Sequence, residues 1–162
     1  MKRYRHLSNP KHTKTNEKKH FSIKDMLPVK ELTIFTDGAS RGNPGEAGAG
    51  AIIYGEQGAL IKKITKYLGT TTNNVAEYMA LIIALNEALA LNGKIVHLFS
   101  DSELMVRQIK GIYKVRDRKM QALWREVKKL LAQFTQYDII CIDRRRNKEA
   151  DKLANLVIDK QN

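Results

Sequence analysis

The first pattern in the sequence is a series of short apolar runs that begins near residue 31 and is interrupted by glycine-rich turns. Residues 32–36, 47–54 and 59–68 each have the length of a strand and are rich in branched, aromatic and small side chains. Only short connections separate these runs, so no crossover can fit between them. We therefore predict three consecutive strands that pair as an antiparallel meander.

Apolar residues at intervals of three and four indicate helices in the rest of the chain. The longest helix is predicted to begin at Asn73 or Asn74, either of which can cap it, and to end at Leu91 before Asn92 and Gly93. Three more helices are predicted at residues 102–110, 118–134 and 147–159, and two more strands at 95–100 and 137–143. Because helices connect these later strands, they should run parallel, which predicts an α/β fold with helices on both faces of a mixed sheet.

Composition separates a basic N-terminal segment from one globular domain. Residues 1–30 carry nine basic and two acidic side chains, together with Pro10 and Pro28, and have too few apolar residues to form a core. We expect a flexible basic arm at residues 1–30 and a catalytic domain at residues 31–162. A chain of 162 residues is long enough for one such domain.

The net charge favours one class of binding partner, and the hydropathy and cysteine content bear on the location of the protein. The formal net charge is +12, and residues 114–129 alone contain seven basic and two acidic residues, which favours a polyanion; a solvated basic face is the alternative. No apolar run approaches the roughly 18 residues of a membrane span. The single cysteine, Cys141, lies in an apolar run and is interpreted as a buried hydrophobe. We expect a cytoplasmic protein without membrane association.

Four acidic residues stand at the boundaries of predicted elements. Asp37 and Asp101 follow strands, and Glu77 and Asp151 lie near the beginnings of helices. Each one alone also suits a turn, a helix cap or a helix dipole. If the four converge at one edge of the sheet, their mutual repulsion requires a divalent cation such as Mg²⁺ or Mn²⁺.

Four sequence blocks carry a resemblance to a known family. They are Asp37-Gly38-Ala39 with Gly42-Asn43-Pro44-Gly45, then Thr71-Thr72-Asn73-Asn74-Val75-Ala76-Glu77, then Ser100-Asp101-Ser102, and finally Asn147-Lys148-Glu149-Ala150-Asp151-Lys152-Leu153-Ala154. In this order they resemble the signature blocks of type 1 ribonuclease H, over essentially residues 31–160. The resemblance implies a five-stranded mixed sheet, with three antiparallel strands followed by two parallel ones.

The resemblance also implies a reaction and its cofactor. In the family, the positions of Asp37, Glu77, Asp101 and Asp151 hold two Mg²⁺ ions, with Asp37 bridging both, and Mn²⁺ is a possible substitute. The implied reaction is hydrolysis of the RNA strand of an RNA–DNA hybrid, which leaves 3′-hydroxyl and 5′-phosphate ends. We expect a monomer.

Further residues match substrate contacts of the family. Ser40, Asn43 and Asn73 match positions at the minor groove of the hybrid, and Thr72 and Asn74 are candidates for contacts to the DNA strand. Lys114 and Arg116 lie in a segment that resembles a compact form of the basic protrusion of some members.

This sequence also departs from the family pattern at two places. Residues 144–146 are three arginines where family members often have a loop histidine, and Glu103 replaces a common neutral amide. His97 cannot take over the role of the loop histidine, because its place in an apolar strand predicts a buried core residue.

Two alternative functions are kept. A nuclease of the same fold could cut another duplex, such as double-stranded RNA, and a catalytically silent module could bind nucleic acid without cutting it. Retention of all four acids argues against the silent module, because concentrated anions would weaken binding to a phosphate backbone.

Overall fold

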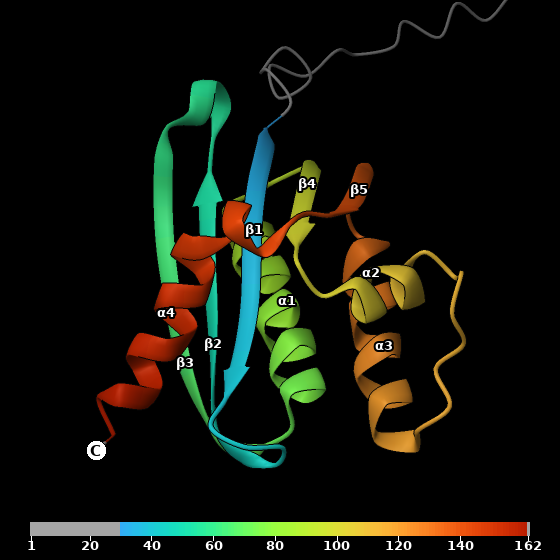
Figure 1. Cartoon of the computed structure of the whole chain (residues 1–162). Coiled ribbons are helices and arrows are strands. Elements are labelled where there is room, and N and C mark those ends of the chain that lie inside the picture. Colours follow the sequence, from blue (N-terminus) through green and yellow to red (C-terminus); the bar gives the residue numbers. More distant parts are fainter. Residues whose placement is uncertain (1–29, 162) are drawn as a thin grey trace, which may run out of the picture.

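The computed structural model describes residues 30–161 as one sheet flanked by helices (Figure 1). The strands are β1 (Glu31–Ser40), β2 (Gly45–Tyr54), β3 (Leu60–Thr71), β4 (Ile95–Ser100) and β5 (Gln136–Cys141). The helices are α1 (Asn73–Ala90), α2 (Glu103–Ile109), α3 (Arg118–Leu131) and α4 (Lys148–Asp159), with 3-10 turns η2 (Glu56–Gly58) and η3 (Arg144–Arg146). Apart from Lys30, the predicted basic arm lies outside the described residues.

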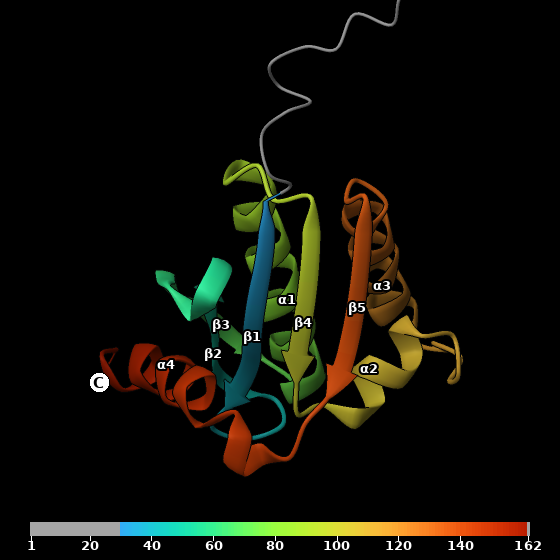
Figure 2. The same ribbon diagram turned by 90° about the horizontal axis from the view of Figure 1, so that it is seen from above.

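The strand order in the sheet is β3-β2-β1-β4-β5. β2 pairs antiparallel with both β1 and β3, whereas β4 pairs parallel with both β1 and β5. Figure 2 shows α1 and α3 on one side of the sheet and α4 on the other. The five-stranded mixed sheet predicted from the sequence is therefore confirmed. Within residues 30–161, no helix is long and apolar enough to cross a membrane.

The hydrophobic core lies between the sheet and the pair of helices α1 and α3. Alternate residues of β1 and β4 point toward these helices, which present apolar faces at helical spacing. The core includes Leu32, Ile34, Val96, Leu98, Leu81, Leu85, Val127 and Leu131, all of them buried. This packing holds β1 as the central strand of the sheet. Its carboxyl end, beside that of β4, is where the predicted acidic residues lie.

Two of the element boundaries that differ from the prediction bear on the position of the predicted site residues. β1 continues to Ser40, because the antiparallel ladder with β2 extends as far as the pair Ser40 and Ala47. Asp37 therefore lies within a strand and not in the turn that follows it. Thr72 is the N-cap of α1, since its hydroxyl accepts a hydrogen bond from the Val75 N–H, so the predicted caps Asn73 and Asn74 are wrong.

The environments of Cys141 and His97 were also predicted wrongly. Cys141 is exposed, because β5 is an edge strand of the sheet. His97 points away from the core and lies between two carboxylates: its Nδ1 is 2.5 Å from Asp138 Oδ1, and its Nε2 contacts Glu31. These two carboxylates raise the pKa of His97, chiefly through the hydrogen bond to Glu31. His97 is therefore part of an ion-pair cluster across three strands.

Candidate active site

The first contact that builds the site is between β1 and the beginning of α1. A Cβ atom at Gly38 would lie 2.2 Å from the carbonyl carbon of Ala76 and 2.3 Å from the nitrogen of Glu77. Such distances are impossible, so only glycine allows the two backbones to touch here. The Gly38 N–H donates a hydrogen bond of 3.2 Å to Glu77 Oε2. Gly38 follows Asp37 directly, so this contact holds the Glu77 carboxylate close to Asp37.

A second pair of glycines brings α4 onto β2. A Cβ atom at Gly50 would lie 2.5 Å from the carbonyl oxygen of Ala150, and one at Gly48 would lie 2.4 Å from that of Ala154. Gly50 is also the strand partner of Asp37 across the β1–β2 ladder. The beginning of α4 therefore rests beside the carboxyl end of β1.

Asn147 fixes the beginning of α4 to β1. Its side chain is buried, and its Nδ2 donates a hydrogen bond of 2.9 Å to the carbonyl oxygen of Thr36, the residue before Asp37. The sequence predicted Asn147 only as a helix cap, but its side chain makes no capping hydrogen bond. Its contact with β1 depends on packing between segments far apart in the chain, which local sequence signals cannot show.

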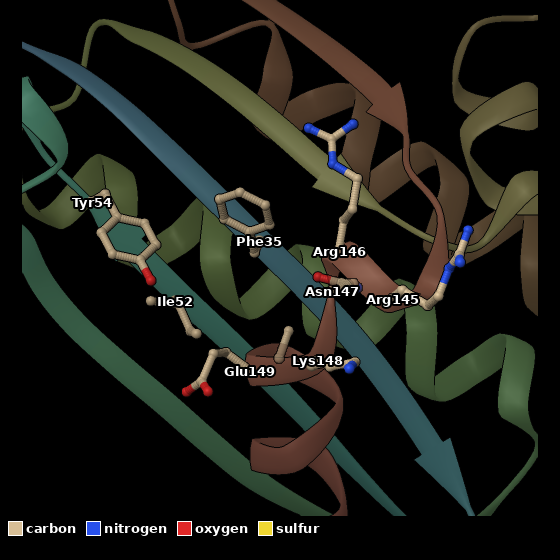
Figure 3. A pocket seen from close by; sticks show the side chains of 9 residues that line it. Phe35, Ile52, Tyr54, Arg145, Arg146, Asn147, Lys148 and Glu149 are labelled. Carbon is tan, nitrogen blue, oxygen red and sulfur yellow. The ribbon is translucent and has the colours of Figure 1, made fainter.

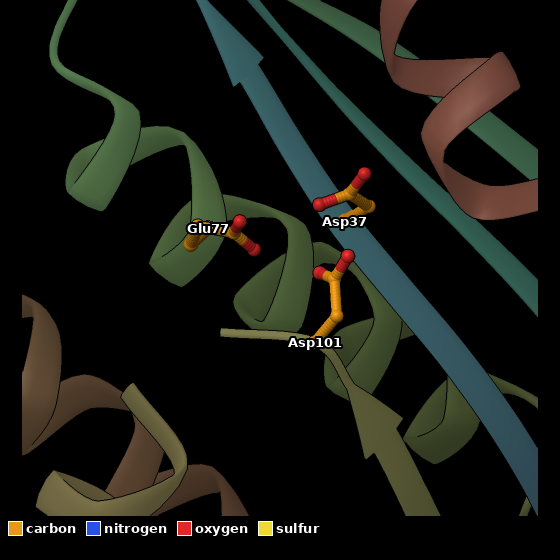
Figure 4. A group of neighbouring side chains, drawn as sticks. All are labelled: Asp37, Glu77 and Asp101. Carbon is orange, nitrogen blue, oxygen red and sulfur yellow. The ribbon is translucent and has the colours of Figure 1, made fainter. Parts of the chain in front are cut away.

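Three carboxylates converge at this place from three different elements (Figure 4). Asp37 comes from β1, Glu77 from the first turns of α1, and Asp101 from the residue directly after β4. One oxygen atom of each can be chosen so that all three lie within 4.8 Å of one another. Asp37 and Glu77 are buried, and Asp101 is partly exposed. The structure therefore brings together three of the four predicted acids as a tight group that could hold a metal ion.

Burial makes the charges of this group costly. Burial raises the pKa of Asp37, and the charges of Glu77 and Asp101 raise it further. Burial also raises the pKa of Glu77, together with the charge of Asp101. A cation placed among the three groups would reverse this effect by favouring their ionised forms.

Asp151 lies beside the group and is held differently. Its side chain is 32% exposed, and its Oδ1 is 3.3 Å from Arg144 Nη2. Asn155 Nδ2 also donates to this oxygen, at 3.2 Å. Asp151 is outside the tight group of three, but its charge contributes to the raised pKa of Asp37. The sequence predicted no contact for Arg144 and showed only that its loop lacks histidine.

The other predicted binding residues fall into two places. Asn43 Oδ1 accepts a hydrogen bond of 3.1 Å from the Asn73 N–H, which ties the β1–β2 turn to the beginning of α1. Ser40 donates to the Gly42 carbonyl in the same turn, Thr72 caps α1, and Asn74 is exposed in its first turn. These five residues therefore cluster at one junction.

Lys114 and Arg116 lie away from this junction, on the connection between α2 and α3 (Figure 1). Both are exposed, and Lys114 lines a cavity of about 520 Å³ with Tyr113, Trp124 and Arg125. Glu103, the acid that departs from the family pattern two residues after Asp101, lies in α2. Its carboxylate accepts a hydrogen bond of 2.9 Å from Arg107 Nε.

Known proteins share this architecture. Residues 35–157 match the family described as reverse transcriptase-like. The ribonuclease H of Chlorobaculum parvum is 38% identical over 147 residues, covering 82% of this chain and 98% of that protein. The bifunctional protein Rv2228c of Mycobacterium tuberculosis is 36% identical over 130 residues, covering 80% of this chain but only 36% of that protein. This chain thus matches about a third of the length of that mycobacterial relative.

Structural similarity agrees with the sequence matches. The crystal structure of LC11-RNase H1 in complex with an RNA/DNA hybrid has a TM-score of 0.76 with this chain, at 39% sequence identity. The similarity covers 80% of this chain and 98% of that one. The family match over most of the chain, the sheet order and the ribonuclease H relatives agree, and this chain belongs to the type 1 ribonuclease H family.

Proposed function

We propose that this protein is a metal-dependent endoribonuclease that hydrolyses the RNA strand of RNA–DNA hybrids. The observation that carries the proposal is the group of Asp37, Glu77 and Asp101, whose carboxylate oxygens lie within 4.8 Å of one another. Such a group has no evident structural use, because burial and repulsion make its charges unfavourable without a cation. A structural relative, LC11-RNase H1, has been captured with an RNA/DNA hybrid.

The donor set fits Mg²⁺ or Mn²⁺. Carboxylate oxygens are hard ligands, and Asp37, Glu77 and Asp101 supply them from elements that backbone contacts hold in place. Asp151 would complete the proposed ligand set from the beginning of α4. When bound, the two ions supply activation of the attacking water and neutralisation of charge on the leaving 3′-oxygen. We expect 3′-hydroxyl and 5′-phosphate ends.

Residues of the chain itself would position the hybrid. The hydrogen bond between Asn43 and Asn73 holds the β1–β2 turn against α1, so that short polar side chains from both elements face one place beside the carboxylates. Polar groups of this kind recognise a ribose 2′-hydroxyl, which both donates and accepts hydrogen bonds. We assign Ser40, Asn43 and Asn73 to the minor groove, and Thr72 and Asn74 to the DNA strand.

The exposed basic connection between α2 and α3 would contact phosphates farther along the duplex. Lys114 and Arg116 are the candidates, and such contacts add affinity without sequence preference. All the proposed catalytic groups come from one chain, so the proposal requires no second copy.

A nuclease assay tests the proposal directly. End-labelled RNA–DNA hybrid, double-stranded RNA and double-stranded DNA are each incubated with the protein in Mg²⁺, Mn²⁺ or chelator. We expect metal-dependent loss of the RNA strand of the hybrid alone, with 3′-hydroxyl ends on the products. Cleavage of double-stranded RNA at a similar rate would support the alternative nuclease. An intact hybrid in both metals would reject the proposal.

A further inference from the structure

The outer face of the sheet carries a row of apolar side chains beside the proposed active site. α4 packs on β2, β1 and β3, and within residues 30–161 no helix covers the outer face of β4 and β5 (Figure 2). The strand registers place four residues of this face next to one another, in the order Ile52, Phe35, Phe99 and Ile140. Phe35 and Phe99 are half-buried, and Ile140 is 40% exposed.

Aromatic rings dominate this row. The rings of Phe35 and Phe99 are stacked, with centroids 4.9 Å apart and an interplanar angle of 17°. Tyr54 meets Phe35 edge-on, at 6.0 Å and 88°. We call Phe35, Tyr54, Phe99 and Ile140 the outer platform. The parallel rings of Phe35 and Phe99 are partly open to solvent, so a planar ligand can pack on them, while Tyr54 stands across one end of the pair.

A pocket of about 250 Å³ joins the outer platform to the beginning of α4 (Figure 3). Its lining includes Phe35 and Tyr54 on one side and Arg146, Asn147 and Lys148 on the other. The Oδ1 atom of Asn147 is buried and has no hydrogen-bond partner among the described residues. In Figure 3 this oxygen points toward the side of the pocket where Phe35 lies. The pocket therefore combines a ring surface with an acceptor that lacks a donor.

The charges around the pocket favour an anionic ligand. Arg145, Arg146 and Lys148 line it together with a single acid, Glu149. Arg145 is held by Asp143, with 3.1 Å between Nε and Oδ1, but Arg146 has no carboxylate partner in the described part of the chain. Figure 3 shows the Arg146 side chain extending over β4. Arg146 is therefore placed to meet a phosphate at the rim of the outer platform.

We propose that the outer platform binds a single-stranded extension of the nucleic-acid substrate, with bases stacked on Phe35 and Phe99 and phosphates at Arg146 and Lys148. The choice of ligand rests on the proposed function, since a nuclease already handles nucleic acid. Phe35 and Asp37 are two residues apart on the same side of β1, a rise of about 7 Å. Because Asn147 is held on the Thr36 carbonyl between these two residues, a strand leaving the carboxylates would pass η3 and the beginning of α4 to reach the rings.

Acidic residues on the same face of the sheet limit how many bases the outer platform can hold. Toward the amino end of β1, His97 and Asp138 lie in the next row, and Glu31 lies one row farther along and contacts His97. Two carboxylates there are unfavourable for a phosphate chain, so the outer platform accommodates one or two bases before the strand must leave the sheet. The cations beside the outer platform also distinguish this surface from the wholly apolar face expected for a permanent contact between two copies.

Binding of a single strand tests the inference separately from cleavage. Fluorescein-labelled hexanucleotides of RNA and of DNA are titrated with the full chain in chelator, so that the result does not depend on metal or catalysis. Phe99→Leu removes the ring face and retains apolar volume, and Arg146→Ala removes an exposed cation. The matched control is Lys129→Ala, which removes an exposed cation from α3 on the opposite side of the sheet.

We expect Phe99→Leu and Arg146→Ala each to weaken binding of the oligonucleotide, the first by roughly tenfold, whereas Lys129→Ala changes it less than either. In isoleucine methyl NMR spectra, the Ile140 signal should shift on titration, while that of the distant Ile112 stays in place. Comparison of the RNA and DNA arms identifies which strand of the substrate supplies the extension.

Three results would overturn the inference. Affinities unchanged in both Phe99→Leu and Arg146→Ala would do so, and Arg146 is fully on the surface, so its variant does not depend on the stability of the core. An Ile140 signal that stays fixed while others move would place the single strand elsewhere. An Ile140 signal that shifts with protein concentration alone, together with a doubled mass in sedimentation, would assign the surface to a second copy.

Discussion

The sheet carries one acidic cluster near each end of β1, and the two clusters differ in how their charges are compensated. At the amino end, Glu31 and Asp138 are held by His97, which lies between them. At the carboxyl end, Asp37 and Asp101 meet a third acid, Glu77, and Arg144, whose charge also acts on them, is paired with Asp151. The first cluster has a partly compensating charge of its own in His97, whereas the second would be compensated by the cation of the proposed function.

The two clusters also differ in the burial of their acidic side chains, which decides how far water screens their charges. The Glu31 and Asp138 side chains are 51% and 46% exposed, so water already screens their charges. Asp37 and Glu77 are 4% and 5% exposed and have little such screening. The raised pKa values of Asp37 and Glu77 show that the charges of the more buried cluster remain largely uncompensated within the chain, which is the electrostatic signature expected of a metal site.

The largest effect is expected from Asp37→Asn, which removes one charge from the uncompensated cluster without changing its volume. Cleavage of the hybrid should fall by on the order of 10³-fold or more, because a buried carboxylate of the proposed metal site is lost. In chelator the variant should melt at a higher temperature than the wild type, since a repelled buried charge is gone. Near wild-type cleavage, measured at saturating Mg²⁺, would show that the contrast between the clusters has no catalytic meaning.

A smaller loss is expected from Asp151→Asn. Its carboxylate is partly exposed and already contacts Arg144 and Asn155, so the site depends on it less than on the buried acids. We expect cleavage to fall by about 10- to 100-fold and to recover partly at higher Mg²⁺ concentration. The measurement is a rate against Mg²⁺ concentration. A loss as large as that of Asp37→Asn would show that cleavage depends on Asp151 as strongly as on the three buried or partly buried acids.

The effect of pH on thermal stability separates the clusters without any cleavage assay. Because the pKa values of Asp37 and Glu77 are raised in the folded state, the folded protein holds protons that the unfolded chain releases. In chelator, stability should therefore fall as pH rises from the range of ordinary carboxyl pKa values toward these raised values.

Added Mg²⁺ should offset this fall, so its stabilising effect on the melting temperature should be larger at pH 8 than at pH 6. Asp37→Asn should reduce the dependence on both pH and metal. A Mg²⁺ effect that is the same at both pH values would contradict proton and metal competition at these carboxylates.

The smallest effect is expected from His97→Gln at the compensated cluster. The raised pKa of His97 means that its charged form stabilises the fold fully below about pH 6.5, the ordinary histidine value, and that this contribution disappears as pH rises through the raised value. Exposure of both acids limits the loss to below about 1 kcal/mol. Denaturant unfolding at pH 5.5 and 9 should show a difference from wild type only at the lower pH.

Much of this arrangement could be predicted from local sequence, and the part that could not depends on strand register. The four acids and the element order follow from short motifs and periodicity. The partners of His97 could not be predicted, because they come from β1 and β5 and meet only when three strands align. For the same reason, exposure of Cys141 required knowing that β5 lies at the edge of the sheet. The contact of Arg144 with Asp151 likewise depends on how η3 turns before α4.

The backbone contacts at Gly38, Gly48 and Gly50 limit how closely α1 and α4 can approach the sheet. Side chains elsewhere in the core can change size and let helices shift by fractions of an ångström, but α1 and α4 already touch the sheet backbone at these positions and can approach no closer. The separation of the acids is therefore governed by main-chain geometry. Variation of core residues such as Leu81 should lower stability well before it alters the spacing on which metal binding depends.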